Sequence, residues 1–218
     1  MTAKTHTISV SRTARYFTLG ELNETTERVW FVLHGYGQLA EYFIRKFEKL
    51  NDGRTLVVAP EALSRFYTDA EYKRVGASWM TRQSSKTEID DYVAYLESIY
   101  KTIFEKGLPK AIQLTVFGFS QGATTACRWL NQGTISCDRL VIWAGYFANG
   151  IQDVIDPARI PSQTYYIFGD QDQFLNQIDF PEYLVQLRKQ IPGLNILDYA
   201  GTHTVDPEIL GLYFGNQK

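Results

Sequence analysis

A serine flanked by glycines is the part of this sequence with the clearest chemical meaning. The segment Gly118-Phe119-Ser120-Gln121-Gly122 matches the pattern G-x-S-x-G, which describes a sharp turn from a strand into a helix that exposes a serine hydroxyl. Glycines two positions either side of the serine suit such a turn, because its backbone segments approach each other closely. The pattern therefore predicts that Ser120 is a nucleophile that attacks acyl carbonyls.

The residues around this motif have the types that a strand, a turn and a helix require. Residues 112–117 are rich in β-branched and aromatic types, as a strand should be. Residues 121–131 form a helix-sized segment, and Gly133 is a suitable stop signal after it. This context favours the strained turn over an ordinary loop with an incidental serine.

A serine hydroxyl needs a base to take its proton, and histidine is the usual one. The chain has three histidines. His6 lies in a polar N-terminal segment, and His34 directly follows a predicted strand. His203 follows the last predicted strand, so it alone gives the chain order Ser, Asp, His that α/β-hydrolases use. We therefore predict that His203 is the base.

An acid must orient the imidazole, and the segment Gly169-Asp170-Gln171-Asp172 lies between the serine and the histidine in the chain. Both Asp170 and Asp172 compete for this role, and Asp170 could instead brace the loop through backbone hydrogen bonds. Spacing alone does not choose between them. Asp198 is a weaker third candidate, because it lies within a predicted strand rather than beyond its end.

Acyl transfer also needs hydrogen-bond donors for the oxyanion that develops on the carbonyl. One donor should be the backbone N–H of Gln121, the residue after the nucleophile. The second should come from the segment His34-Gly35-Tyr36-Gly37, whose two glycines let the backbone approach a substrate.

The rest of the chain alternates between strand-like and helix-like stretches, which predicts an α/β fold with a mostly parallel central sheet and helices on both faces. The expected strands cover residues 7–10, 15–19, 28–33, 55–59, 112–117, 140–144, 165–168 and 195–199. The expected helices cover residues 88–105, 121–131 and about 177–189, with a last one starting at 206. The carboxyl ends of the strands are where such sheets bind ligands, and the proposed serine, acid and oxyanion segments all fall there.

Composition excludes several classes of protein. With 218 residues, 44% of them hydrophobic, and a net charge of −2, we expect one domain spanning residues 1–218 that does not bind nucleic acid. We expect no integral membrane segment and, because the N-terminus lacks the apolar core of a signal peptide, a cytoplasmic location. Cys127 and Cys137 fit no metal or redox spacing, so we expect both to pack in or near the core and no metal site.

Residues 60–86 form a long segment after a predicted strand, which we interpret as a loop insertion over the active site. With Tyr36, the aromatic residues Phe66 and Trp79 are candidates for lining the substrate pocket; the equal alternative is that these rings fill a small core of the loop itself. The basic residues Arg65, Lys73, Arg74 and Arg82 in this segment are better explained as a solvated surface than as a site for anions.

Four blocks together resemble the phospholipase/carboxylesterase family of α/β-hydrolases, which includes carboxylesterases and acyl-protein thioesterases. They are residues 33–37, 118–122, 169–172 and 201–203, and the resemblance covers about residues 28–212. It implies the α/β-hydrolase fold, with Ser120 as nucleophile, His203 as base, Asp172 as acid and the N–H groups of Tyr36 and Gln121 as oxyanion donors. His34 would be a structural residue.

The sequence departs from the family pattern at two places. Gln38 stands where the family commonly has Asp, and Gln173 and Phe174 follow the acid where Pro and an aliphatic residue are common. These departures concern substrate preference more than the catalytic residues.

The function that follows is hydrolysis of a small-molecule carboxylic ester or thioester through an acyl-enzyme on Ser120, with no cofactor. Alternatives within the fold are a lysophospholipase and an acyl-protein thioesterase; a lactonase of the dienelactone-hydrolase type is disfavoured, because that group normally uses a cysteine. An alternative of another class is a non-catalytic ligand-binding protein on a hydrolase fold. The oligomeric state is left open.

Overall fold

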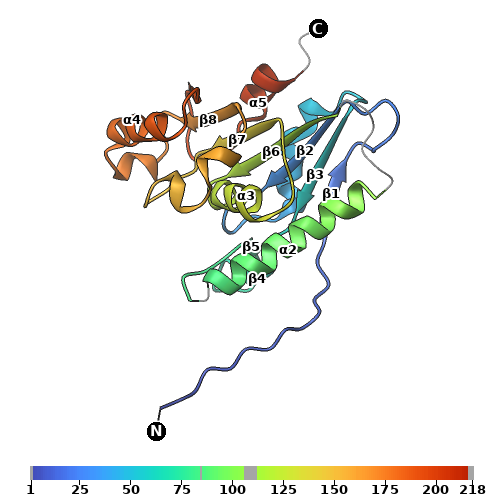
Figure 1. Ribbon diagram of the computed structural model, residues 1–218, viewed down its shortest axis with the longest axis vertical. Helices are drawn as coiled ribbons and strands as arrows, with labels where there is room; N and C mark the ends of the chain where they lie inside the picture. Colours follow the sequence, from blue (N-terminus) through green and yellow to red (C-terminus); the bar gives the residue numbers. More distant parts are fainter. Residues whose placement is uncertain (1, 84, 106–111, 216–218) are drawn as a thin grey trace.

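A mostly parallel β-sheet forms the centre of the molecule. The computed structural model describes residues 2–83, 85–105 and 112–215, and within them the main sheet has seven strands in the order β1-β3-β2-β6-β7-β8-β9 (Figure 1). Only β1 runs antiparallel, against β3. The strands are β1 (Tyr16–Leu19), β2 (Arg28–Leu33), β3 (Thr55–Pro60), β6 (Gln113–Phe119), β7 (Arg139–Trp143), β8 (Gln163–Gly169) and β9 (Asn195–Tyr199).

The apolar runs predicted as buried strands are buried on both faces of this sheet. In β2, successive side chains point to opposite faces. Val29 and Phe31 join the hydrophobic core on one side of the sheet. Trp30 and Val32 join the core on the other side. A strand that faces two cores needs no polar alternation, which explains its continuous hydrophobic sequence.

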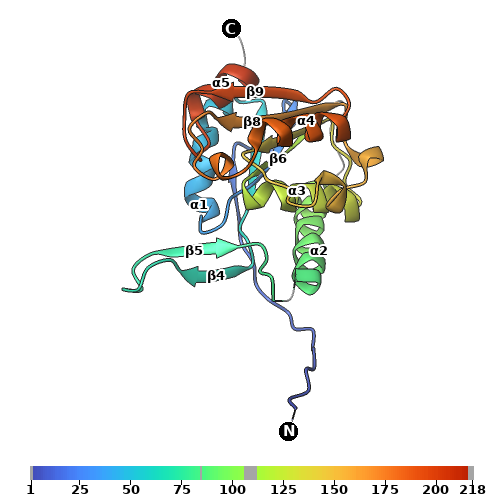
Figure 2. The ribbon, with the colours of Figure 1, turned by 90° about the vertical axis from the view of Figure 1, so that its left-hand side faces the viewer.

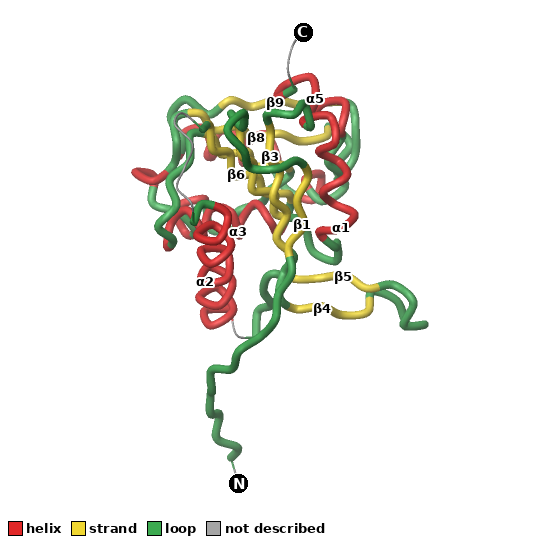
Figure 3. Tube along the Cα trace, turned by 90° about the vertical axis from the view of Figure 1, so that its right-hand side faces the viewer, coloured by secondary structure: helices red, strands yellow, loops and turns green. Residues whose placement is uncertain are grey.

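Helices cover both faces of the sheet, and Figure 3 shows α2 and α3 on one side and α1 and α5 on the other. The first side is covered by α2 (Ser85–Ile103), α3 (Gln121–Gln132) and α4 (Phe180–Gln190). The second is covered by α1 (Ala40–Phe43), the 3-10 helix η1 (Ile44–Leu50) and α5 (Pro207–Phe214). Shorter 3-10 turns are η2 (Ile151–Asp153), η3 (Pro157–Arg159) and η4 (Leu175–Gln177).

This arrangement confirms the predicted α/β-hydrolase architecture, with each expected strand but one present. The exception is residues 7–10, which were predicted as a strand and are not one. This segment pairs with no strand of the described chain, and the side chains of Ile8 and Val10 are 88% and 79% exposed. Alternating polar and β-branched residues gave the strand signal, but without a partner the segment stays an extended arm. Figure 1 shows it running away from the body.

Residues 60–86 contain a β-hairpin rather than an irregular loop. Its strands are β4 (Ser64–Tyr67) and β5 (Val75–Ser78), which pair antiparallel (Figure 2). The carboxylate of Asp69 closes the turn by accepting hydrogen bonds from the backbone N–H groups of Glu71, Lys73 and Arg74. These bonds to the charged form lower the pKa of Asp69.

Among the described residues, no helix combines the length and the apolar composition that crossing a membrane requires. The longest, α2, is amphipathic: Tyr92, Val93 and Leu96 are buried against the sheet, while Asp91, Ala94 and Ser98 are exposed.

The helix predicted from Asp206 is present, and its first turn provides a test of local stability. Asp206 accepts hydrogen bonds from the N–H groups of Glu208 and Ile209, and Pro207 occupies the first turn. Replacing Asp206 with Ala removes an N-cap and should lower the free energy of unfolding by about 1 kcal/mol. Asp206→Asn keeps a capping oxygen and serves as the control. Urea titrations that give Ala and Asn the same stability would contradict this role.

Candidate active site

Ser120 occupies the sharp turn between β6 and α3. Its backbone has φ 53° and ψ −116°, a region that costs a non-glycine residue free energy and persists only where the surroundings enforce it. The backbone N–H of Ser120 donates to the carbonyl of Trp143 on the neighbouring strand β7, at 2.9 Å. The turn is therefore fixed by the sheet, as the G-x-S-x-G pattern predicts.

The two glycines of the motif are required by close backbone contacts. A Cβ at Gly118 would collide with the carbonyl oxygen of Gly122 and the backbone of Ala123. A Cβ at Gly122 would collide with the carbonyl oxygens of Leu33 and His34 at the end of β2. The start of α3 thus packs directly on the end of β2, and only glycine allows that approach.

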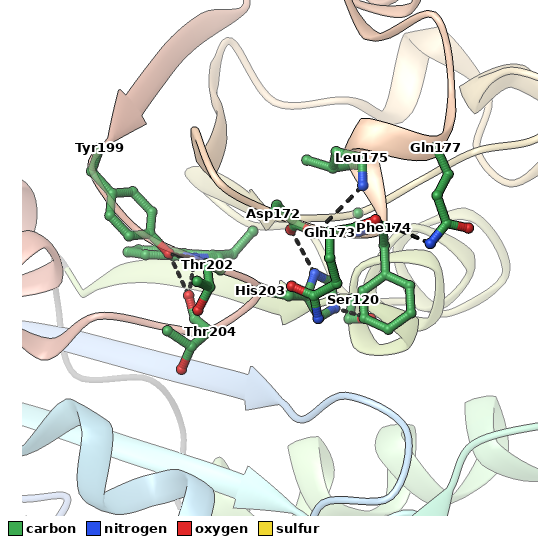
Figure 4. Close-up of polar contacts among 12 residues, drawn as sticks. Ser120, Asp172, Gln173, Phe174, Leu175, Gln177, Tyr199, Thr202, His203 and Thr204 are labelled. Carbon is green, nitrogen blue, oxygen red and sulfur yellow. Dashed lines mark hydrogen bonds and ion pairs between the residues drawn. The ribbon is translucent and has the colours of Figure 1, made fainter.

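His203 connects Ser120 to Asp172. Its Nε2 lies 2.9 Å from the Ser120 Oγ, and its Nδ1 lies 2.6 Å from the Asp172 Oδ2 (Figure 4). Because a carboxylate only accepts, Nδ1 carries the proton and donates it to Asp172. The unprotonated Nε2 then accepts the hydrogen bond of the serine hydroxyl, which is the arrangement in which an imidazole can take that proton.

The structure separates the two competing aspartates by what each side chain contacts. The side chain of Asp172 is fully buried; besides His203 it accepts from the backbone N–H of Phe174, at 2.9 Å. Asp170 is exposed, and its carboxylate accepts from the backbone N–H of Gly201 at 3.0 Å. Asp170 therefore braces the loop that carries His203, while Asp172 contacts the imidazole. Asp198 is exposed on β9.

Two aromatic rings hold the imidazole of His203. Its ring centre lies 4.9 Å from that of Phe119 and 4.6 Å from that of Phe174, which meets it edge-on. As a result only 14% of the His203 side chain is exposed. Phe174 itself is 56% exposed, so one of its sides faces a potential ligand. Figure 4 shows its ring beside Ser120 and His203.

The loop that carries His203 is tied down from two directions. The Tyr199 hydroxyl donates to the carbonyl of Thr204 at 2.5 Å, and the Trp143 indole N–H donates to the same oxygen at 2.9 Å. From η1, the ammonium of Lys46 donates to the carbonyl of Val205 at 2.9 Å. Burial lowers the pKa of Lys46. These bonds fix the backbone next to the imidazole.

The backbone N–H groups of Tyr36 and Gln121 have no acceptor among the described residues. The segment around Tyr36 is rigid: the Gln38 amide oxygen accepts from the N–H of Gly35 at 2.9 Å, and the N–H of Gly37 donates to Ala77 on β5 at 2.9 Å. The side chain of Gln38 therefore supports this loop. The free N–H groups lie on residues that line the same cavity as Ser120.

The side chain of Gln121 attaches the two residues that follow the β4–β5 hairpin, Trp79 and Met80, to the start of α3. Its amide oxygen accepts from the backbone N–H of Trp79 at 3.0 Å, and its amide nitrogen donates to the carbonyl of Met80 at 2.9 Å. One residue thus presents a backbone N–H next to the serine and anchors the neighbouring segment by its side chain.

His34 is buried and structural. Its Nε2 accepts from the backbone N–H of Ala62 at 3.1 Å, its Nδ1 lies 2.8 Å from the carbonyl of Gly35, and its own carbonyl accepts from the Trp79 indole. Burial, the largest effect, lowers the pKa of His34 to about 4. The ring is therefore neutral near pH 7 and joins the end of β2 to residue 62.

The cavity around Ser120, which we call the Ser120 cavity, has a volume of about 640 Å³. Its lining includes Ser120 and His203 and the exposed rings of Tyr36, Tyr146 and Phe174. Of these rings only Tyr36 was expected at the pocket. Tyr146 follows β7 and Phe174 follows β8, so the rule that sites form at the carboxyl ends of strands would have found both.

Phe66 and Trp79, the two tentative pocket residues, are not in the lining of this cavity. Trp79 is only 2% exposed, and its ring packs 5.2 Å from that of His34. The ring centre of Phe66 lies 5.1 Å from that of Tyr36, so Phe66 contacts a lining residue without lining the cavity itself. Trp79 does not fill a separate core of the segment either: its ring packs on His34 and Tyr92, its indole N–H donates to the His34 carbonyl, and it belongs to the main hydrophobic core.

The two cysteines stand apart from this site. Both are free; Cys127 is buried in α3, and burial raises the pKa of each thiol to about 12. A thiol with such a pKa is a poor nucleophile near neutral pH. No group of three or more metal-ligating side chains occurs in the described ranges.

Comparisons with known proteins agree with this geometry. Residues 24–208 match the model of the family described as Serine hydrolase (FSH1). No curated protein sequence is detectably similar to the chain.

Solved structures share the fold at low sequence identity. Acyl-protein thioesterase 2 of Zea mays is 18% identical and has a TM-score of 0.65, with 90% of this chain and 94% of that chain covered. A phospholipase/carboxylesterase of Dyadobacter fermentans is 18% identical, with a TM-score of 0.61 over 94% and 98% of the two chains. Esterase PE8 is 19% identical, with a TM-score of 0.61 over 91% and 95%.

The contacts of the two aspartates predict different effects on the reactivity of Ser120. Asp172→Asn removes the charge that faces the imidazole, and the rate of Ser120 labelling by a fluorophosphonate should fall by about 10³-fold or more. Asp170→Asn keeps an oxygen for the Gly201 N–H and should stay within about tenfold of the wild type. Labelling rates from intact-protein mass spectrometry test this, and the reverse ranking would make Asp170 the acid.

The burial of His34 predicts a specific dependence of stability on pH. Folding lowers the pKa of His34 from 6.5 to about 4, so between these values the unfolded chain binds the additional proton. The stabilisation is complete above pH 6.5 and is lost as the pH falls toward 4, by about 3 kcal/mol. His34→Gln offers an acceptor without this titration and should flatten that part of the curve. Denaturant titrations from pH 7.5 to 4.5 measure it; equal slopes in both proteins would exclude His34 as the cause.

Proposed function

The chain belongs to the Serine hydrolase (FSH1) family, and from that premise we propose that it hydrolyses carboxylic esters through an acyl-enzyme on Ser120. The observation that carries the proposal is the hydrogen-bonded series Ser120–His203–Asp172, with distances of 2.9 and 2.6 Å. Both are hydrogen-bond distances, which is the reach that proton transfer from the serine to the histidine requires.

In the first half of the reaction the Ser120 oxygen attacks the ester carbonyl while His203 Nε2 takes the hydroxyl proton. The carbonyl oxygen becomes an oxyanion, and the N–H groups of Tyr36 and Gln121 are its proposed donors. Because neither N–H has an acceptor within the described chain, both can bond the oxyanion without first breaking a protein hydrogen bond. Asp172 stabilises the imidazolium that forms. His203 then gives its proton to the leaving alcohol oxygen, and the carbonyl is restored as an acyl-enzyme.

In the second half, water attacks the acyl-enzyme while His203 Nε2 accepts its proton. The same two donors hold the new oxyanion, and the Ser120 oxygen leaves with the proton from His203. The products are a carboxylic acid and the free enzyme. A thioester would follow the same path, with a thiol as leaving group.

The proposed substrate is a small molecule, because the Ser120 cavity of about 640 Å³ has the size of a site for such ligands. We further propose that residues 1–218 act as one domain, since helices from both halves of the chain pack on one sheet. A cytoplasmic location stays a prediction from the sequence.

Removal of the nucleophile is the direct test. Ser120→Ala should reduce hydrolysis of p-nitrophenyl butyrate by at least about 10⁴-fold, because the acyl-enzyme can no longer form. The expected signal in the wild type is multiple turnover together with a transient mass increase of one butyryl group on Ser120.

A matched control is Ser98→Ala. Ser98 lies on the exposed side of α2, with its hydroxyl bonded to the carbonyl of Ala94 within the same helix. This variant should hydrolyse the ester at the wild-type rate. Turnover by Ser120→Ala equal to that of the wild type would refute the assignment, and a wild type that binds esters without turnover would favour the ligand-binding alternative.

A further inference from the structure

A second cavity adjoins the Ser120 cavity along helix α3. This α3 cavity has a volume of about 710 Å³. The two cavities share the lining residues Tyr36, Gln121, Thr124 and Tyr146. A ligand bound at Ser120 can therefore continue past these residues into the α3 cavity.

One face of α3 lines the α3 cavity, and the last residue of this face is the positively charged Arg128. Gln121, Thr124, Thr125 and Arg128 all line the α3 cavity, and their spacing of three and four places them on one side of the helix. Arg128 lies about 11 Å along the helix axis from Gln121. Side chains in helices lean toward the N-terminus, so its guanidinium group is directed back toward the serine end.

The contacts of Arg128 support this placement. Its Nη1 lies 2.8 Å from the Met80 sulfur, and the Met80 carbonyl is the acceptor for the Gln121 side chain. The guanidinium therefore lies beside the segment that Gln121 holds at the start of α3.

The charge of Arg128 is not neutralised by the described part of the protein. A guanidinium has five N–H donors, and its neighbours among the described residues are the Met80 thioether, which is a weak acceptor, and the hydroxyl of Tyr92. These two acceptors leave donors of the guanidinium unfilled. No carboxylate of a described residue lies within 4.0 Å of it. The other charged residues that line the α3 cavity are Arg82 and Asp153, so positive charge prevails there. A half-buried cation with unfilled donors at the end of a cleft is suited to bind an anionic group.

The position of His203 decides which end of a substrate reaches Arg128. The leaving oxygen must take a proton from His203 Nε2, so the alcohol part lies at the side of the Ser120 cavity lined by His203, Phe174 and Ile178. None of these three lines the α3 cavity. The acyl part therefore extends over α3.

We propose that the preferred substrate is an ester whose acyl chain ends in a carboxylate that binds the guanidinium of Arg128. The proposal rests on the ester hydrolase function proposed above. It predicts an acyl chain that places the carboxylate less than about 11 Å from the reacting carbonyl, because the Arg128 side chain leans back toward the serine end of the helix. A guanidinium can donate two parallel hydrogen bonds to such a carboxylate.

The test compares two esters that differ only at the end of the acyl chain, the mono-p-nitrophenyl ester of octanedioic acid and p-nitrophenyl octanoate. The measured quantity is the ratio of their kcat/KM values, acid-ended over uncharged. The wild type should favour the acid-ended ester by about tenfold or more, as a charged hydrogen bond predicts. In Arg128→Gln this ratio should fall by about the same factor. Arg188→Gln, on the exposed side of the last turn of α4, is the control and should keep the wild-type ratio.

The outcomes separate this inference from the proposed function. If the wild type hydrolyses neither ester, the proposed function itself fails. If it hydrolyses the octanoate ester without preferring the acid-ended one, or if Arg128→Gln slows both esters equally, the inference fails and Arg128 only supports the segment at Met80.

Should Arg128→Gln not fold, Arg128→Lys carries the test. Lysine keeps the charge but loses the paired donors, so the ratio should lie below that of the wild type and above one. A ratio in Arg128→Lys equal to that of the wild type would overturn the proposal that the guanidinium binds a carboxylate.

Discussion

The close contact between the start of α3 and the end of β2 is the constraint on which the site depends. At Gly122 the helix backbone meets the carbonyl groups of Leu33 and His34 without room for a Cβ. This contact forces Ser120 into a strained conformation, with φ 53°, and brings the N–H of Gln121 close to the segment that carries Tyr36. The nucleophile and both proposed oxyanion donors are thus products of one packing contact between a helix and a strand.

The acid and the base depend on a second contact of the same kind. A Cβ at Gly169 would collide with the carbonyl oxygen of Gly201, so the loops after β8 and β9 lie directly against each other. Asp170 links them through Gly201, while Asp172 reaches His203. Four loops at the carboxyl ends of neighbouring strands therefore converge because two pairs of them touch at glycines. Parallel strands make this possible, since they end at the same edge of the sheet.

The sequence predicts the structural elements that have a known motif or hydrophobic pattern. It does not predict contacts that depend on the direction in which a side chain points. The turn at Ser120 and the position of His203 follow from a motif and from chain order, and the sheet follows from continuous apolar runs such as β2. The choice between Asp170 and Asp172 needs the hydrogen-bond partners of each carboxylate, which spacing does not contain. Trp79 is of an aromatic type that is common in ligand pockets, but in the structure its indole N–H points inward to the carbonyl of His34. The sequence indicates no role for Arg128, because the acceptors of its guanidinium depend on which side chains, such as Met80, pack beside it.

The double role of Gln121 has a consequence for protein engineering. Its side chain holds the backbone of Trp79 and Met80, and its backbone follows the nucleophile directly. The hairpin is consequently not an exchangeable module: a hairpin transplanted from a relative must place the backbone N–H of residue 79 and the backbone carbonyl of residue 80 where the Gln121 amide can reach both. Loop-swapping libraries built on this scaffold should therefore vary the hairpin tip around Asp69, which bonds its own turn, and leave residues 78–80 intact.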